Sequence, residues 1–419
     1  MGMVKLGEVM NYPRFFPALA HTDILPYASG SKRKLMSIRR LFPPEIQRRF
    51  LISLSFDEEI HYQTNETYGD QAGLREYDKG LREPEEVFVD CGAFHYKDME
   101  IPRLNRGTVV TPTGTIRHYQ KRHYDRSDDT TFFLCSPDHI IRKDMDEDES
   151  KERTEWTLNQ AEEFIQLSKE KLPSAKPVGV VHGRNMEERL SMMESMIDVG
   201  FNNVAFGGLV PLAGDKSEVL QQVAGIDSTS SGEIPYSPLH LAKSEGCSVH
   251  MLGLGSPDWY KIFLNLGIDS FDTAKLSQEG AKNGLIWEES KDLPDESNKP
   301  IKSNQLYSKS QTKKMGDVQW SNTDPRTPIF PQAPESESIL DQNPVGGYFR
   351  KSICTSKKCR HGPDAHVQDP RMTGSAGHNM ARTIINAHVF QSMMERMNNF
   401  CELSLTEDRF SDWAPMVLE

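Results

Sequence analysis

The chain has 419 residues, 37% of them hydrophobic, with a formal net charge of −12 and six cysteines. This length fits one large domain with an appendage or about two or three ordinary domains. The acidic balance excludes a uniformly polycationic protein, and so few cysteines do not suggest a disulfide framework. Without an apolar run near the roughly 20 residues that span a bilayer, and without a signal-peptide pattern, we expect no membrane partner and a reduced, cytosolic protein.

Basic residues gather in three clusters despite the acidic total. The clusters lie within residues 32–49, 117–126 and 350–360. A charge cluster is usually only a solvated surface. An acidic protein that binds nucleic acid must, however, meet it with local basic faces. Three such clusters together favour a nucleic-acid partner.

The middle of the chain alternates short β-rich runs with amphipathic helical stretches. The predicted strands are 87–89, 131–134, 177–181, 203–206, 248–252 and 268–271. A helix is predicted around Trp156 and Leu172, another over 187–199 and another over 259–266. Gly200 and Gly267 are expected to end the last two helices, because glycine at a helix C-terminus adopts the left-handed conformation without strain.

Polar residues and glycines stand at or just beyond the end of each predicted strand. They are Asp90, Asp138, His182 with Gly183, Gly207 with Gly208, Gly253 with Gly255, and Asp272. Alternating strands and helices imply a parallel sheet with right-handed crossovers, which is either doubly wound or a closed barrel. Each glycine alone indicates a turn, and each aspartate alone a helix N-cap. Their succession at one rim favours an α/β fold of the (β/α)8 TIM-barrel type with its chemistry at that rim.

Composition divides the chain into three expected parts. Residues 1–297 form the predicted catalytic barrel, with a divergent N-terminal part. Residues 298–347 are rich in Lys, Ser, Gln, Asn and Pro without sustained periodicity, which predicts a polar insertion or linker. Residues 348–419 hold a segment rich in Cys and His and then a closing helix over about 380–399, whose predicted buried positions include Ile384, His388, Met393 and Met397.

The segment rich in Cys and His predicts a structural Zn²⁺ site. Four residues separate Cys354 from Cys359, and four histidines follow: His361, His366, His378 and His388. Thiolate and imidazole are preferred zinc ligands, and a structural site takes four of them. Because the preceding linker is too polar to build a core, a metal would stabilise this segment. The alternative is two ordinary free cysteines in a basic loop.

Two of the rim carboxylates, Asp90 and Asp272, indicate glycosyl chemistry. One carboxylate can attack an anomeric carbon and form a covalent glycosyl intermediate, while a second acts as general acid or base toward the departing or arriving group. The Gly207–Gly208 pair would let a flat ligand approach backbone N–H groups closely. The residues alone therefore indicate glycosyl transfer or hydrolysis.

Several short motifs resemble, in order and spacing, those of the tRNA-guanine transglycosylases. They are 205–209 (AFGGL), 251–257 (MLGLGSP), 267–272 (GIDSFD) and 282–284 (KNG). Residues 87–94 are similar to that family's early Asp-Ser-Gly-Gly-Phe motif, and the Cys354–Cys359 pair with 384–388 looks like its zinc segment. The resemblance covers most of 87–284 and again 354–397. The first eighty residues match much less clearly.

The resemblance implies a reaction and its two catalytic residues. Asp272 matches the nucleophile that attacks the ribose C1′ and expels guanine. Asp90 matches the general acid/base that handles the proton of the exchanged base. A family enzyme exchanges guanine for a 7-deazaguanine, such as 7-cyano-7-deazaguanine, without a redox cofactor.

The resemblance also implies a substrate-binding set: Asp138, His182, Gly207, Gly208, Leu209 and Leu252. Gly208 and Leu209 match backbone that binds the oxygen and 7-substituent of the base. Asp138 approximately matches the acid that pairs with the N1 and amino edge of guanine. His182 takes the place of a base-binding glutamine, which keeps a hydrogen-bonding group but changes its geometry.

The chain departs from the family at the zinc segment and after the nucleophile. Ser356 stands where the family has a third cysteine, so the implied ligands are Cys354, Cys359, His361 and His388, with His366 and His378 as alternatives for the fourth donor. The stretch 276–282 replaces a Pro-Thr-Arg segment that contacts RNA, and Glu279 lies beside the place of its arginine. An acid there would repel phosphate.

These departures favour DNA over tRNA as the polymer. The profile is most similar to the DNA-guanine transglycosylases of phages and bacteria, which implies cytoplasmic DNA modification, in the host cytoplasm if a phage encodes the chain, and phage anti-restriction. We expect base exchange in DNA through a covalent glycosyl-aspartate.

tRNA is the alternative substrate, and a non-catalytic nucleic-acid-binding barrel subunit is the alternative function. A metal-dependent hydrolase barrel would need ligands gathered on the rim, where His182 and His250 are scattered. A homodimer and helper proteins are left open.

Overall fold

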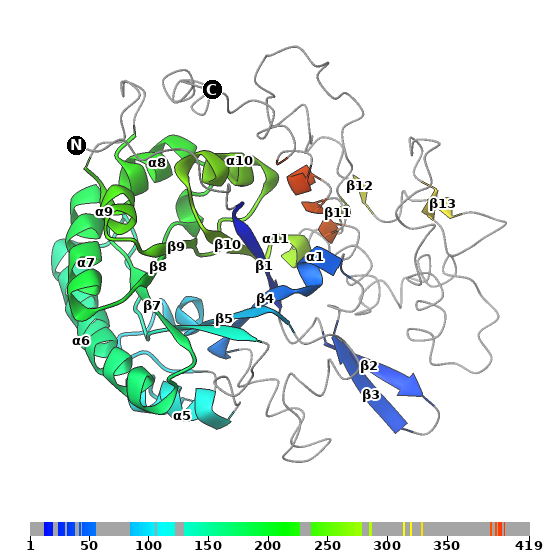
Figure 1. Ribbon diagram of the computed structural model, residues 1–419, viewed down its shortest axis with the longest axis horizontal. Coiled ribbons are helices and arrows are strands. Elements are labelled where there is room, and N and C mark those ends of the chain that lie inside the picture. Colours follow the sequence, from blue (N-terminus) through cyan, green and yellow to red (C-terminus); the bar gives the residue numbers. More distant parts are fainter. Residues whose placement is uncertain are drawn as a thin grey trace, which may run out of the picture.

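The computed structural model describes residues 12–19, 24–29, 32–37, 42, 44–55, 84–104, 107–121, 130–226, 236–278, 285–286, 313–314, 319–320, 328–329 and separate positions within 386–398. Within these residues eight parallel strands close into a barrel, which confirms the predicted (β/α)8 fold (Figure 1). The strands follow one another round the barrel in chain order: β1 (Arg14–Leu19), β4 (Arg49–Ser53), β5 (Glu86–Asp90), β6 (Thr131–Cys135), β7 (Lys176–Val181), β8 (Asn203–Phe206), β9 (Ser248–Met251) and β10 (Ser270–Thr273).

The six predicted strands correspond to β5 to β10. β8 has the predicted bounds, whereas β10 begins two residues later than predicted, so that Asp272 lies inside the strand instead of after it. β1 and β4 were not among the predicted strands. They close the barrel by pairing with each other and with β10 and β5, respectively.

Helices cover the outside of the barrel, and most of them form an arc round the strands in Figure 1. They are α1 (Pro44–Gln47), α4 (Ala93–Tyr96), α5 (Pro112–Lys121), α6 (Glu147–Lys171), α7 (Met186–Val199), the 3-10 turn η3 (Val210–Leu212), α8 (Lys216–Ala224), α9 (Pro238–Ser244), α10 (Pro257–Leu266) and α11 (Lys275–Ser277). α7 and α10 end as predicted, because Gly200 and Gly267 adopt left-handed C-caps at φ 102° and 66°. Each of these two helices begins at a side-chain cap, Asn185 and Ser256.

Aromatic side chains fill the barrel interior beneath the rim. Phe88 of β5 lies 5.7 Å from Phe16 of β1 and 5.9 Å from Phe133 of β6, measured between ring centroids. The His250 imidazole of β9 stacks on the Phe88 ring at 3.9 Å. His250 is therefore held by the aromatic side chains packed inside the barrel and lies toward the carboxyl ends of the strands.

The described positions of the C-terminal helical segment pack over the first and last strands of the barrel. Phe390 packs edge-on against Phe15 of β1 at 4.9 Å and against Phe271 of β10 at 6.2 Å. The Tyr260 hydroxyl donates to Asn398 Oδ1 at 2.6 Å. Met393 is buried, as predicted for the closing helix. Ile384, His388 and Met397, the other predicted buried positions, lie outside the described residues.

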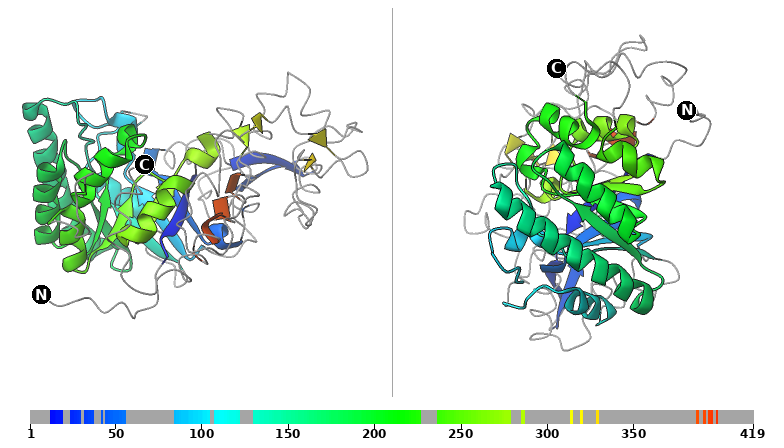
Figure 2. Two further views of the ribbon diagram at one scale, coloured as in Figure 1. Left: turned by 90° about the horizontal axis from the view of Figure 1, so that it is seen from above. Right: turned by 90° about the vertical axis from the view of Figure 1, so that its left-hand side faces the viewer.

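An antiparallel hairpin follows the carboxyl end of β1, formed by β2 (Ile24–Ser29) and β3 (Lys32–Ser37). The hairpin extends away from the barrel (Figures 1 and 2). Two short antiparallel pairs also occur, β11 (Leu285–Ile286) with β12 (Lys313–Lys314) and β13 (Gln319–Trp320) with β14 (Pro328–Ile329). Of these strands, β12 to β14 fall within the predicted polar insertion. Among the described residues, none of the helices has the length and apolarity needed to cross a membrane.

Candidate active site

Three carboxylates meet at the carboxyl ends of the barrel strands. Asp90 ends β5, Asp138 lies just beyond β6, and Asp272 lies in β10. The charges of both Asp272 and Asp138 raise the pKa of Asp90, so the three groups are near enough to interact. The structure thus brings together the two predicted catalytic aspartates and the predicted base-binding acid.

Asp90 titrates near neutral pH. Burial is the largest cause that raises its pKa, to about 7, and Asp272 and Asp138 add to that effect. The Gly92 N–H and the Ser53 hydroxyl, the latter at 3.2 Å, both donate to Asp90 Oδ1 and oppose the rise. A carboxyl group with a pKa near the working pH can donate and accept protons with equal ease, which suits a general acid/base.

Asp272 is buried, with 5% of its surface exposed, and is held through one oxygen. The Gly253 N–H donates to Oδ1 at 2.7 Å, and His250 Nε2 lies 3.2 Å from the same oxygen. Burial lowers the pKa of His250, against the opposite effect of Asp272. The neutral imidazole donates Nε2–H to Asp272 and accepts from the Ser270 hydroxyl at Nδ1, 2.8 Å away.

The second oxygen of Asp272, Oδ2, has no hydrogen-bond partner among the described residues. The carboxylate is therefore oriented by its first oxygen, while its second oxygen is unpaired within the described part of the chain. Such an arrangement suits a nucleophile, because the bonds to Oδ1 fix the direction of Oδ2 without occupying it.

Asp138 is buried and accepts two hydrogen bonds. The Cys91 thiol donates to Oδ1 at 2.6 Å, and His182 Nε2 lies 2.6 Å from Oδ2. Burial raises the pKa of Cys91 well above its usual range, so the thiol keeps its proton and donates. Cys91 Sγ is also 3.2 Å from the Tyr96 hydroxyl, which ties Asp138 to the start of the loop after β5. The sequence indicated Asp138 and His182 but not Cys91.

The glycine pair after β8 lies against the His182 imidazole. A Cβ atom at Gly207 would fall 2.4 Å from His182 Cε1, and one at Gly208 would fall 3.1 Å from His182 Nδ1. The Gly207 N–H already donates to the Val181 carbonyl at 3.0 Å. The space that glycine leaves at position 207 is thus filled by the protein's own imidazole. The sequence had predicted that this space would serve a flat ligand.

The remaining predicted base-binding residues stand beside this turn. Leu209 is fully buried, and Leu252 is partly buried with its N–H donating to the Phe206 carbonyl at 3.1 Å. No acceptor for the Gly208 or the Leu209 N–H occurs among the described residues. Within the described residues these two N–H groups of the turn are therefore without a partner.

Arg189 supports the glycine turn from beneath and was not indicated by the sequence. It is 1% exposed, and its guanidinium donates to the Gly207 carbonyl at 2.9 Å and to Gln222 Oε1 at 3.0 Å. Burial lowers its pKa to about 9. A Cβ atom at Gly183 would lie 2.7 Å from the Arg189 backbone nitrogen, so only glycine fits that position. A charged residue in an amphipathic helix normally faces solvent, which is why no sequence signal identified it.

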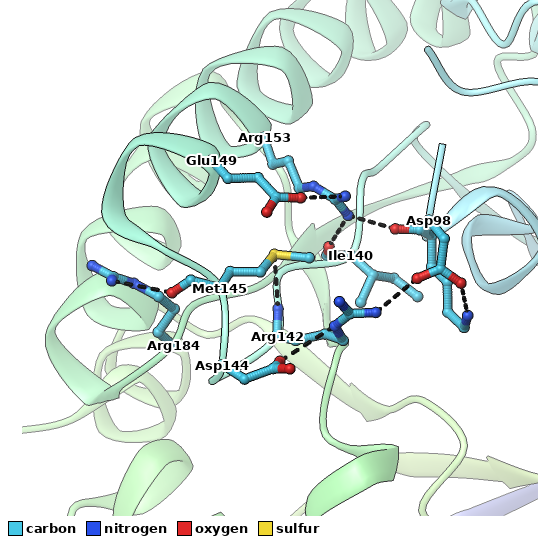
Figure 3. Close-up of polar contacts among 9 residues, drawn as sticks. Asp98, Ile140, Arg142, Asp144, Met145, Glu149, Arg153 and Arg184 are labelled. Atoms are coloured by element: carbon cyan, nitrogen blue, oxygen red, sulfur yellow. Dashed lines mark hydrogen bonds and ion pairs between the residues drawn. The ribbon is translucent and has the colours of Figure 1, made fainter. Parts of the chain in front are cut away.

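Two arginines join the loops that carry Asp90 and Asp138 (Figure 3). Arg153 of α6 donates to the carbonyls of Lys97 and Ile140, both at 2.7 Å. Arg142 donates to Asp98 at 2.7 Å. Lys97 and Asp98 follow β5, whereas Ile140 and Arg142 follow β6. The two loops are therefore held together on the outer side of the site.

The predicted zinc ligands Cys354, Cys359, His361 and His388 all lie outside the described residues. Within the part of the chain that is described, His, Cys, Asp and Glu side chains form no group of three or more that could hold a metal ion. Zinc therefore stays a prediction.

The chain is similar to two known proteins over about half of its length. No family model matches the chain. A DNA-guanine transglycosylase of Salmonella montevideo is 27% identical over 203 residues, covering 46% of this chain and 42% of that protein. A queuine tRNA-ribosyltransferase of Dechloromonas aromatica (strain RCB) is 22% identical over 237 residues, covering 56% of this chain and 47% of that protein. Both similarities, at modest identity, support the predicted resemblance to the tRNA-guanine transglycosylase superfamily.

This similarity agrees with the closed barrel and with the carboxylates at its rim. The matched part spans less than half the length of either relative.

Proposed function

We propose that this chain is a guanine transglycosylase that exchanges guanine in DNA for a 7-deazaguanine base through a covalent glycosyl-aspartate. The observation that carries the proposal is the difference between two neighbouring carboxyl groups. Asp272 is fixed through one oxygen and has no described partner at the other, whereas the pKa of Asp90 is raised to about 7. One group suits a nucleophile and the other an acid/base, which are the two roles that base exchange needs.

The reaction follows from these roles. Asp272 Oδ2 attacks C1′ of the sugar, the C1′–N9 bond breaks, and protonated Asp90 gives its proton to the departing guanine. The result is a glycosyl ester of Asp272, an ionised Asp90 and a free base. The incoming 7-deazaguanine then gives its N9 proton to Asp90 while N9 attacks C1′, and the Asp272 carboxylate leaves. Asp90 ends protonated, so the cycle closes without another reactant.

Two features support DNA as the polymer. The Salmonella relative, whose name specifies DNA, is 27% identical, against 22% for the relative whose name specifies tRNA. The segment after the nucleophile also lacks the arginine that the family directs to RNA and carries Glu279 beside that place. In duplex DNA the target guanine must leave the base stack before attack, at a cost of about a few kcal/mol.

The β2–β3 hairpin is our proposed contact to the DNA backbone. Its second strand begins with Lys32, Arg33 and Lys34, and it follows the carboxyl end of β1, where the strand ends of the site lie. Replacing these three residues by serine should weaken DNA binding and lower the slope of log K against log salt by up to about three. An unchanged salt slope would show that the hairpin does not contact phosphate.

We also propose that Cys354, Cys359, His361 and His388 hold a structural Zn²⁺. The fit rests on donor chemistry, because thiolates and imidazoles are the ligands that zinc prefers and Ser356 is a poor one. When bound, the metal would stabilise a segment that follows a polar insertion. It takes no part in the chemistry proposed for Asp90 and Asp272.

A base-exchange assay tests the function. Labelled guanine or 7-cyano-7-deazaguanine is supplied with duplex DNA, single-stranded DNA or tRNA, and covalent protein–nucleic acid adducts are trapped by denaturation. We expect label and adduct with DNA for the wild type and neither for Asp272→Ala. Asp198→Asn serves as the matched control, because Asp198 is exposed near the end of α7, on the outside of the barrel.

The results separate the alternatives. Label entering tRNA but not DNA would establish the second candidate, a tRNA-guanine transglycosylase, which the Dechloromonas relative favours. An absence of both label and adduct across a panel of sequences would overturn the enzymatic proposal in favour of a nucleic-acid-binding barrel subunit. Adduct formation by Asp272→Ala would show that another group is the nucleophile.

A further inference from the structure

We propose that His250 is a positioning residue that sets the balance between the free Asp272 carboxylate and its glycosyl ester. Its imidazole stabilises the carboxylate more than the ester, and so favours release of the covalent intermediate. This inference rests on the proposed function, which supplies the glycosyl-aspartate. It goes beyond that function by assigning a role to a residue for which the resemblance to the family implies none.

The His250 ring is held in place by stacking and by a hydrogen bond. The side chain is 2% exposed and stacks on Phe88 at 3.9 Å, with an angle of 20° between the rings. Phe16 meets the ring edge-on at 5.8 Å, and Nδ1 lies 2.8 Å from the Ser270 hydroxyl. The ring cannot turn without breaking these contacts, so Nε2 stays beside Asp272 Oδ1.

The partners of His250 determine which nitrogen carries its proton. An ionised carboxylate only accepts hydrogen bonds, so Nε2, 3.2 Å from Asp272 Oδ1, carries the proton. Nδ1 then accepts from the Ser270 hydroxyl. Burial lowers the pKa of His250 against the opposite effect of Asp272, which agrees with a neutral ring. Asp272 is therefore bound by a neutral N–H at the end of a chain from Ser270 through His250.

The charge of Asp272 changes during the proposed exchange. When Oδ2 bonds to C1′ and the C1′–N9 bond breaks, the electron pair of that bond leaves with guanine, which takes the Asp90 proton. Oδ1 then becomes the carbonyl oxygen of a neutral ester. The return step gives the electron pair of the C1′–Oδ2 bond back to Asp272 and restores its charge. His250 donates to Oδ1 in both states, but the acceptor is charged in only one of them.

This difference gives the hydrogen bond a direction. A hydrogen bond to an ionised group is about twice as strong as one between neutral groups. The Nε2–H donor therefore stabilises the free carboxylate more than the ester. The Gly253 N–H, 2.7 Å from Oδ1, acts in the same sense but belongs to the backbone. Removing the His250 donor should shift the equilibrium toward the ester by about fivefold to tenfold.

The amount of covalent adduct at equilibrium tests this assignment. Full-length protein is incubated with saturating guanine-containing DNA and increasing free guanine, then denatured, and the adduct is quantified. If the exchange assay labels only tRNA, tRNA takes the place of DNA. Free guanine competes with Asp272 for C1′, so the guanine concentration that halves the adduct measures the equilibrium. The matched control is His240→Asn, because His240 is exposed on α9.

Two substitutions separate the Nε2–H donor from the rest of the ring. In His250→Asn the amide oxygen reaches the place of Nδ1 and keeps the bond from Ser270, but the amide does not reach Asp272. In His250→Gln an amide N–H reaches the place of Nε2 and keeps the donor. We expect His250→Asn to need about five to ten times more guanine than the wild type to halve the adduct, and His250→Gln to need about the same amount.

Ser270→Ala provides a test that leaves His250 in place. The Ser270 hydroxyl polarises the ring, because hydrogen bonds in a chain strengthen one another. Its removal should weaken the Nε2–H donor and raise the guanine requirement by about twofold. Thermal unfolding establishes that each variant is folded. If His250→Asn does not fold, Ser270→Ala decides by the same measure.

Each outcome decides the point. An unchanged guanine requirement in His250→Asn, even with a slower approach to equilibrium, would show that His250 only supports the barrel. An equal increase in His250→Asn and His250→Gln would show that the ring acts without its Nε2–H donor, and would also overturn the inference. A wild type that forms no adduct would overturn the proposed function and this inference with it. A wild type that forms adduct confines any failure to the inference.

Discussion

Replacing Asp90 by asparagine should stabilise the protein at alkaline pH while removing its proposed activity. The folded protein holds the Asp90 proton more tightly than the unfolded chain does, since its pKa is raised from 3.8 to about 7. The unfolded state therefore loses its proton first as pH rises. Below about pH 4 the Asp90 side chain does not lower the free energy of unfolding. The loss of stability that it causes grows between pH 4 and 7 and then levels off.

The size of the effect follows from the two pKa values. The interval from 3.8 to about 7 corresponds to roughly 4 kcal/mol at 1.36 kcal/mol per unit. This is an upper limit, because Asp90 is only partly buried and water reaches the carboxylate. Asparagine is nearly isosteric and its Oδ1 still accepts from Gly92 N–H and Ser53, so the substitution removes the charge with little change in packing.

Urea unfolding of the wild type and Asp90→Asn at pH 4.5, 6 and 8 measures the effect. We expect the variant to be more stable at pH 8 by about 1–4 kcal/mol and the difference to shrink toward zero at pH 4.5. Asp198→Asn, which removes an exposed charge, is the control and should show a small difference that varies little with pH. A variant that is less stable than the wild type at pH 8, or equally stabilised at all three values, would contradict the assignment of Asp90 as a group that titrates near neutrality.

Four further predictions concern the site and the predicted zinc segment. The rate of covalent adduct formation should fall as pH rises through about 7, since Asp90 must be protonated. Ser53→Ala removes a hydrogen bond that favours the ionised form, so the midpoint should move up by about half to one pH unit, and a downward shift would contradict this. Gly207→Ala should weaken guanine binding by about tenfold or more in equilibrium titrations, because its Cβ would lie 2.4 Å from His182 Cε1; unchanged affinity would show that the ring can move freely. Cys354→Ser protein should contain less zinc by metal analysis, and unchanged stoichiometry would refute that ligand.

The barrel could be predicted because its strands and helices carry local signals. Six strands stood out as β-rich runs between amphipathic helices, and Gly200 and Gly267 marked helix ends that the structure confirms. β1 and β4 were not predicted, although β4 carries the short apolar run 50–52 (FLI). β1 contains Pro17, which is disfavoured within sheets, and β4 begins at Arg49 inside a basic cluster. Both depend on pairing with distant strands, which local pattern does not encode.

The sequence predicted the carboxylates of the candidate site, but not all of the residues that contact them. Asp90, Asp138 and Asp272 were identified because polar residues at successive strand ends share one rim. Cys91 and Arg189 were missed, because their roles arise from contacts across the fold. The thiol serves as a donor to a carboxylate from another loop, and the guanidinium satisfies a carbonyl from another strand. Neither contact leaves a periodic or spacing signal in the sequence.

The polarity of the donors at the rim explains how one site can hold an acid and a nucleophile together. An opposite charge near a carboxyl group typically lowers its pKa by about 1–3 units. The described partners of Asp90, a backbone N–H and a hydroxyl, are neutral, and Asp272 is held by a backbone N–H and a neutral imidazole. The buried cation nearest the glycine turn, Arg189, is directed to the Gly207 carbonyl instead of to a carboxylate. Since no described cation bonds to either group, burial and mutual repulsion act on Asp90 unopposed by charge, and a proton stays there for the departing base.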